Sequence, residues 1–149
     1  MKRLKRRSAL VVMAALLTVG IQGATVASAS WEAGNPDQPN VWTFASPSTN
    51  LGSSTSAVMY GAGYNTSLQG HIAICTWTTP DNEECGWDSL ASFTPSGGSW
   101  GPVNVTIPRS FALSGQYGPG RVIDCRTAGC HLTPVAENYL GGHSLSFAP

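Results

Sequence analysis

Residues 71–85, HIAICTWTTPDNEEC, decide how the fold is interpreted. The first seven residues alternate in the manner of a β-strand, so that successive side chains face opposite sides. One face would carry Ile72, Ile74 and Thr76, and the other His71, Ala73, Cys75 and Trp77. We expect Ile72 and Ile74 to lie in a core. The face with Cys75 and Trp77 can line a cleft, or it can form a second layer of core around Trp77.

The four cysteines form two pairs that are close in the chain. Cys75 and Cys85 bracket TWTTPDNEE, and Cys125 and Cys130 bracket RTAG. Four cysteines allow three pairings, and the short spacings favour the local pairing, Cys75–Cys85 and Cys125–Cys130. Metal ligation is the alternative. The first spacing is wider than that of cysteine pairs in structural zinc sites, which disfavours it.

Residues 1–29 have the features of a secretory signal peptide. A basic segment, MKRLKRR, precedes a short apolar segment, SALVVMAALLTVG, and Ala27-Ser28-Ala29 fits a cleavage site. A retained membrane anchor is the alternative, but the apolar segment is short for a bilayer. We therefore expect a secreted, extracellular protein with no membrane contact after cleavage. That compartment permits disulfide bonds.

Loss of the signal would change the charge of the protein. The whole chain has eight basic and eight acidic residues, and five of the basic residues precede residue 8. The remaining three basic and eight acidic residues give the mature chain a net charge of −5. Such a surface can neutralise few phosphates, so we expect no direct tight binding to nucleic acid.

The remaining 120 residues suit one domain, with residues 30–46 as an N-terminal arm and first strand and residues 47–149 as the rest. Short strands separated by Gly, Pro, Ser and Asn clusters are expected throughout, with no sustained helical period. The predicted strands are Val41–Ala45, Ser56–Gly63, His71–Trp77, Ser89–Phe93, Gly101–Pro108, Gly120–Cys125 and His143–Phe147. This pattern predicts an all-β fold, a seven-stranded immunoglobulin-like antiparallel β-sandwich.

We expect binding rather than catalysis, since no group of residues defines a reaction mechanism. The acidic residues between the first two cysteines and just beyond could mimic a catalytic carboxylate pair, but charged loops are normally solvated. Those residues are Asp81, Glu83, Glu84 and Asp88. The three histidines His71, His131 and His143 lack metal-ligand spacing. They are expected to be surface residues or polar contacts to a ligand, with no metal and no cofactor.

An ordered set of motifs resembles the neocarzinostatin family, from about Pro47 to Phe147. The motifs are GAGY at 61–64, ICTW at 74–77, EECGWDSLASF at 83–93, VNVTIPRSFAL at 103–113, DCRTAGC at 124–130 and SLSF at 144–147. The family consists of secreted proteins that hold enediyne antibiotics. The resemblance implies a seven-stranded sandwich with a ligand cleft at one side.

The resemblance also implies site residues. Cys75 and Cys85 would form the cleft floor, with Trp77 on a wall. Leu90 stands where a stacking phenylalanine of the family would be, and Gln116 or Tyr117 falls at a second such position. Further ligand contacts would come from Thr133, Val135 and Gly142 on the opposite wall, and from His71.

The resemblance implies a secreted, monomeric protein that binds, protects and delivers an apolar enediyne-type chromophore. Such a protein would be antimicrobial, and it would act on DNA only through the released chromophore. The alternative is an exported immunoglobulin-like module whose cleft has diverged to bind a different small molecule.

Overall fold

A computed structural model describes residues 31–33, 38–79, 82–86, 88–114 and 120–149. Every regular element among them is a β-strand. The strands are β1 Trp31–Ala33, β2 Trp42–Ser46, β3 Ser54–Ala62, β4 Gly70–Thr79, β5 Asn82–Cys85, β6 Ala91–Phe93, β7 Ser99–Pro108, β8 Ser110–Ala112, β9 Val122–Asp124, β10 Cys130–Ala136, β11 Tyr139–Leu140 and β12 His143–Ser144. Among these residues, no helix is long and apolar enough to cross a bilayer. The predicted signal peptide lies outside them.

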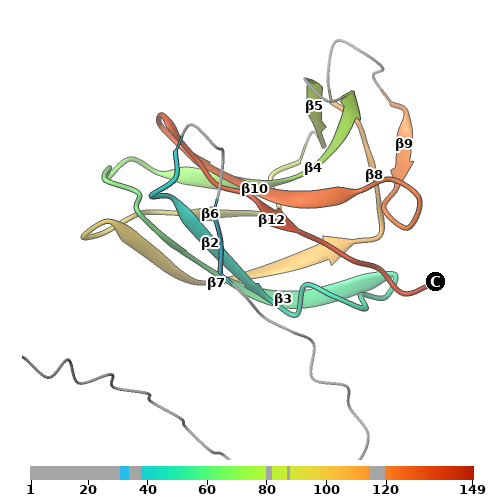
Figure 1. Cartoon of the computed structure of the whole chain (residues 1–149), viewed down its shortest axis with the longest axis horizontal. Coiled ribbons are helices and arrows are strands. Elements are labelled where there is room, and N and C mark those ends of the chain that lie inside the picture. The colour runs from blue at the N-terminus through green and yellow to red at the C-terminus, as the bar shows by residue number, and fades with distance from the viewer. Residues whose placement is uncertain (1–30, 34–37, 80–81, 87, 115–119) are drawn as a thin grey trace, which may run out of the picture.

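The strands form two antiparallel layers and a short ribbon (Figure 1). The first sheet has the order β1-β2-β3-β7. The second has the order β11-β10-β4-β5, with β12 also paired to β10 and β6 to β4. Each edge of the second sheet is therefore built from two short segments. The β8–β9 ribbon is joined to the β5 end, where the Ser114 amide donates to the Cys85 carbonyl at 3.0 Å.

The core lies between the two sheets. Met59 and Ile107 contribute from the first sheet, and Ile72, Ile74 and Leu132 from the second, all almost fully buried. The expectation that Ile72 and Ile74 are core residues is confirmed, since β4 presents them toward the first sheet. Apolar burial of this kind is the main favourable contribution to folding.

The GAGY segment closes one end of this core. A Cβ atom at Gly61 would lie 2.1 Å from Trp100 Nε1, so the indole occupies the space that any side chain would need. Gly63 adopts a φ of +86° and approaches the Asn40 carbonyl, which excludes a side chain there. Tyr64 is fully buried, packs edge-on against Phe93 and Trp100, and donates to the Pro134 carbonyl at 3.4 Å. Its burial raises the pKa of the phenol to about 12.

The all-β sandwich is confirmed, but two strands near the predicted cleft were not predicted. The segment around Glu83 and Glu84 is strand β5 rather than a solvated turn. Strand β10 was missed because it contains Pro134, which argues against a central strand. The Pro134 carbonyl accepts from the Gly141 amide at 2.9 Å, on the edge away from β4. The N–H that Pro134 lacks would point to this same edge, where the chain passes from β11 to β12, so the pairing of β10 with β4 does not need it.

Other predicted boundaries shift. The predicted strand Gly120–Cys125 shortens to β9, and His143–Phe147 shortens to β12. Strands β1, β8 and β11 are three or fewer residues long and had no periodic signal.

Candidate ligand-binding site

The candidate site lies on the outer face of the second sheet, where β10, β4 and β5 run side by side. Cys75 of β4 is opposite Cys85 of β5 on one side and opposite His131 of β10 on the other. The two cysteines form a disulfide with a Cα–Cα distance of 4.0 Å. The second disulfide, Cys125–Cys130, joins the end of β9 to β10. Both predicted disulfides are therefore present, and none of the four cysteines is free.

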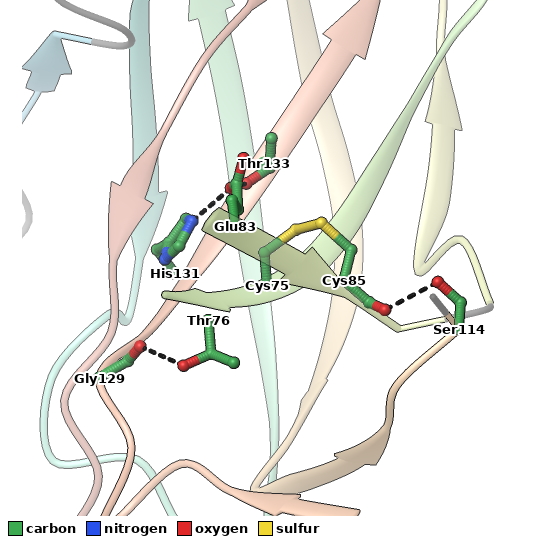
Figure 2. The surroundings of a disulfide bond; sticks show 8 residues. All are labelled: Cys75, Thr76, Glu83, Cys85, Ser114, Gly129, His131 and Thr133. Carbon is green, nitrogen blue, oxygen red and sulfur yellow. Dashed lines mark hydrogen bonds and ion pairs between the residues drawn. A yellow bond between two sulfur atoms is a disulfide. The ribbon is translucent and has the colours of Figure 1, made fainter. Parts of the chain in front are cut away.

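A polar cluster reaches across the disulfide. Glu83 Oε1 accepts a hydrogen bond from the His131 imidazole and another, at 2.8 Å, from Thr133 Oγ1. Figure 2 shows these three side chains on one side of the strands, while Thr76 points away from them toward the Gly129 carbonyl. Glu83 comes from β5 and its two partners come from β10, so its side chain bridges over β4.

The Glu83 carboxyl is held in its charged form. The hydrogen bond from His131 lowers its pKa below the ordinary value, and the Thr133 hydrogen bond and the His131 charge add to this effect. Partial burial opposes the shift but is the weaker influence than the first hydrogen bond. The cluster therefore places an ionised carboxylate, bonded to His131 and Thr133, beside the disulfide.

Trp77 lies at the edge of this cluster. Its indole stacks on the His131 imidazole, with ring centroids 5.6 Å apart and planes inclined by 20°. The residue is nevertheless 57% exposed. Trp77 is thus largely open to solvent, and the alternative of a second core layer around it is wrong.

A cavity of about 250 Å³ opens beside Trp77. Its other lining residues come from the polar cluster, from β1, and from β11, β12 and the turn between them. The lining residues are Glu32, Ala33, Trp77, Glu83, His131, Leu140, Gly141, Gly142, His143 and Ser144. Of the residues implied by the family resemblance, Trp77 and Gly142 therefore meet in one cavity. Cys75, Cys85 and Thr133 belong to the disulfide and the polar cluster next to this cavity, although they do not line it.

The other implied residues lie elsewhere or are not described. Leu90 lines a different cavity of about 270 Å³, together with Phe111 of the β8–β9 ribbon. His71 and Val135 face each other at the far end of β4 and β10. Gln116 and Tyr117 lie outside the described residues, so their position relative to Trp77 and Leu90 stays a prediction.

The expectation that Glu84 is solvated is wrong: the residue is buried, and its Oε1 accepts from Thr78 Oγ1 at 3.2 Å and from Asn82 Nδ2 at 3.1 Å. His143 was expected either at the surface or in contact with a ligand. It is buried, and its Nδ1 donates to the Thr43 carbonyl at 3.3 Å, so the surface alternative is wrong, but the residue does line the cavity beside Trp77. The alternation of NEEC places Glu83 and Glu84 on opposite faces, a signal that could have separated their roles.

Residues 97–101, GGSWG, fit the letters of a nucleophile-elbow motif, G-x-S-x-G. That motif acts on a sharp turn from a strand into a helix. Ser99 instead begins β7, after a turn in which its amide and hydroxyl both donate to the Ser96 carbonyl. The surroundings of Ser99 do not match the motif's structural context.

Replacing Glu83 with glutamine should make folding less sensitive to acid. Because the folded-state pKa is depressed, the ionised carboxylate contributes its full stability above the unfolded-state pKa, near 4.5, and loses it as the pH falls through the lower folded-state value. Unfolding free energies measured at pH 7 and pH 3 should show Glu83→Gln less stable than the parent at pH 7, with a smaller gap at pH 3. An equal gap at both pH values would show that Glu83 contributes no pH-dependent stability.

The two-layer antiparallel sandwich, with a disulfide beside a cavity on one outer face, defines the class: a small immunoglobulin-like β-sandwich protein. The neocarzinostatin family matches residues 43–147, and the chain belongs to that family.

Two solved structures share the fold. Macromomycin superposes with a TM-score of 0.62 at 15% identity, covering 72% of this chain and 99% of macromomycin. The solution structure of apokedarcidin superposes with a TM-score of 0.55 at 24% identity, covering 81% of this chain and 99% of that one. No curated protein sequence matches the chain.

Proposed function

We propose that this protein is a secreted carrier that binds an apolar, enediyne-type chromophore without covalent linkage, protects it and delivers it. The observation that carries the proposal is the open indole of Trp77 beside the disulfide and the cavity of about 250 Å³. An exposed aromatic face at a concave site suits a flat ring system. Membership of the neocarzinostatin family supports the same ligand class.

The charge of the chain supports delivery rather than direct action on DNA. Residues 30–149 carry three basic and eight acidic side chains, which disfavours contact with phosphates. Any antimicrobial DNA damage would come from the released chromophore. In this proposal the protein works as an extracellular monomer without a cofactor and without catalysis.

A second candidate is the same exported module with a different small-molecule ligand. Glu32 and Glu83 line the cavity beside Trp77, so part of the lining is acidic. These carboxylates favour a ligand that combines an aromatic part with hydrogen-bond donors. A purely apolar chromophore would add no hydrogen bond to those that Glu83 accepts from His131 and Thr133 and that Glu32 accepts from the Ser144 amide.

Replacing Trp77 with alanine should weaken binding of a neocarzinostatin-type chromophore by about 2 kcal/mol, the loss typical of a buried aromatic anchor. The residue is largely exposed in the free protein, so the fold should be unaffected. Fluorescence titration of parent and variant with this chromophore measures the difference.

Trp42→Ala is the matched control, because Trp42 is 41% exposed on the other sheet. It should bind like the parent. Equal affinities for parent and Trp77→Ala would show that the chromophore does not bind at Trp77. No binding to the parent would favour the second candidate.

A further inference from the structure

Aromatic side chains gather on the outer face of the first sheet, on the opposite layer from the candidate ligand site. The register places Trp31 of β1 opposite Phe44 of β2, and Phe44 opposite Tyr60 of β3. Trp42 lies in the neighbouring row, opposite Ala33 and Ala62. Three successive strands thus carry an aromatic ladder, Trp31–Phe44–Tyr60, that none of the core interactions requires.

The ladder is open to solvent. Trp31 is 50% exposed and Tyr60 36% exposed, with Phe44 half-buried between them. The ring centroids of Trp31 and Phe44 are 5.6 Å apart, and those of Phe44 and Tyr60 are 5.9 Å apart. Contiguous exposed apolar surface on a soluble protein usually marks a binding site.

A groove of about 360 Å³ adjoins both ends of the ladder. Its rings are Trp31, Tyr60 and Trp100, and its hydroxyls belong to Thr94, Ser96 and Ser99. Gly61, Ala62 and Gly101 complete it, so none of the nine lining residues carries a charge. Gly101 has a φ of +110°, and a Cβ there would lie 2.9 Å from the Tyr60 ring. The missing side chain leaves room for Tyr60 beside the groove.

We propose that this face binds a neutral polysaccharide, of the kind with equatorial hydroxyl groups and a flat C–H face on each sugar. The weakly positive C–H groups of such a face pack on the negative faces of aromatic rings. The sugar hydroxyls can exchange hydrogen bonds with the Ser and Thr hydroxyls of the groove. The rings are inclined to one another, by 42° between Trp31 and Phe44 and by 62° between Phe44 and Tyr60. Trp31 and Tyr60, the two rings of the ladder that line the groove, would therefore contact separate sugars of one chain, and an uncharged lining matches an uncharged ligand.

The composition of the groove bears on two other occupants. Protein–protein interfaces are enriched in aromatic residues and depleted in serine, and this groove has three aromatic residues and two serines among nine. The sedimentation measurement below tests a protein partner of this kind. Nucleic acid bases also stack on aromatic rings, but their binding requires a positively charged groove for the phosphates. The lining offers no lysine or arginine for that purpose.

The experiment measures binding of the purified protein to cellohexaose and chitohexaose by calorimetry, and its retention on insoluble cellulose and chitin. Trp31→Ala and Tyr60→Ala should each weaken binding about tenfold, the size of the loss of one stacked ring. Trp77→Ala, which removes an exposed indole from the other sheet, should bind like the parent. Thermal unfolding of each variant shows that the fold is retained.

Binding to at least one of these sugars that is weakened by Trp31→Ala and Tyr60→Ala, but not by Trp77→Ala, supports the proposal. No binding of the parent to either sugar, or equal loss in all three variants, overturns it. Concentration-dependent dimers in sedimentation that Tyr60→Ala abolishes would also overturn it, because they would assign the face to a second copy of the chain. The test uses no chromophore, so its outcome is separate from that of the carrier proposal.

Discussion

Replacing Gly61 with alanine is expected to destabilise the fold by about 3 kcal/mol, at the upper end for overpacking a core. The added Cβ would lie 2.1 Å from Nε1 and 2.2 Å from Cε2 of Trp100. Trp100 has little room to move, since its ring stacks on Phe93 at 4.2 Å and meets Tyr64 at 5.7 Å. Alanine restricts the unfolded chain more than glycine does, but that effect offsets only about 0.4–1 kcal/mol.

Guanidinium unfolding of parent and Gly61→Ala measures this effect, with Gly129→Ala as the control. A Cβ at Gly129 would meet no atom within 4 Å, and the residue is exposed. The control should change stability by no more than about 0.5 kcal/mol, as for surface substitutions. If Gly61→Ala is as stable as the control, the indole of Trp100 does not occupy the space above Gly61.

The sequence predicts the central strands well because local alternation and burial agree there. In β4 and β7 the apolar residues alternate with small or polar ones, and the structure buries Ile72 and Ile74 in the first strand and Val105 and Ile107 in the second. One face of each strand packs against the other sheet, so a shift by one residue would expose the core set. Tertiary structure and local pattern therefore select the same register.

The edges of the second sheet could not be predicted in this way. Strand β5 holds four polar or cysteine residues, and it forms because β4 supplies a partner and the disulfide fixes the register at Cys75 and Cys85. Strand β10 forms despite Pro134, which has no N–H to donate. The position of that N–H faces away from β4, toward the edge where the chain passes from β11 to β12, so no hydrogen bond to β4 is lost. Both depend on which strands become neighbours, and the local pattern of residues within each strand does not contain that information.

In the candidate site, too, local patterns predict some of the residues, while other contacts depend on strand pairing. Trp77 could be singled out from the alternation of β4, and the disulfide from the cysteine spacing. The interaction between Glu83 and His131 joins residues 48 positions apart. It requires β10 to pair with β4 so that His131 stands beside Cys75. Local acidity alone indicates a solvated loop, so the charge in the cavity was missed.

Removing the Cys75–Cys85 disulfide is expected to lower the free energy of unfolding by about 3 kcal/mol, the chain-entropy value for closing a loop of this length. It should also loosen β5 in the folded protein. Strand β5 is four residues long and pairs with β4 along an edge of the sheet, so the covalent link holds a substantial part of it. Loosening β5 would separate Glu83 from His131 and Thr133, and would remove one wall of the cavity beside Trp77.

The double variant Cys75→Ala/Cys85→Ala tests both effects, and Cys125→Ala/Cys130→Ala is the matched control. The control bridge closes a loop with a sequence separation of 5 instead of 10, so its loss should cost less, about 2 kcal/mol. Amide hydrogen exchange should accelerate at Asn82–Cys85 in the first variant and not in the second, since local opening exchanges before global unfolding. Chromophore affinity should also fall in the Cys75→Ala/Cys85→Ala variant. Lower stability with unchanged exchange in β5 would mean that the bridge acts through the unfolded chain alone, and that β5 and the Glu83 cluster hold their place without it.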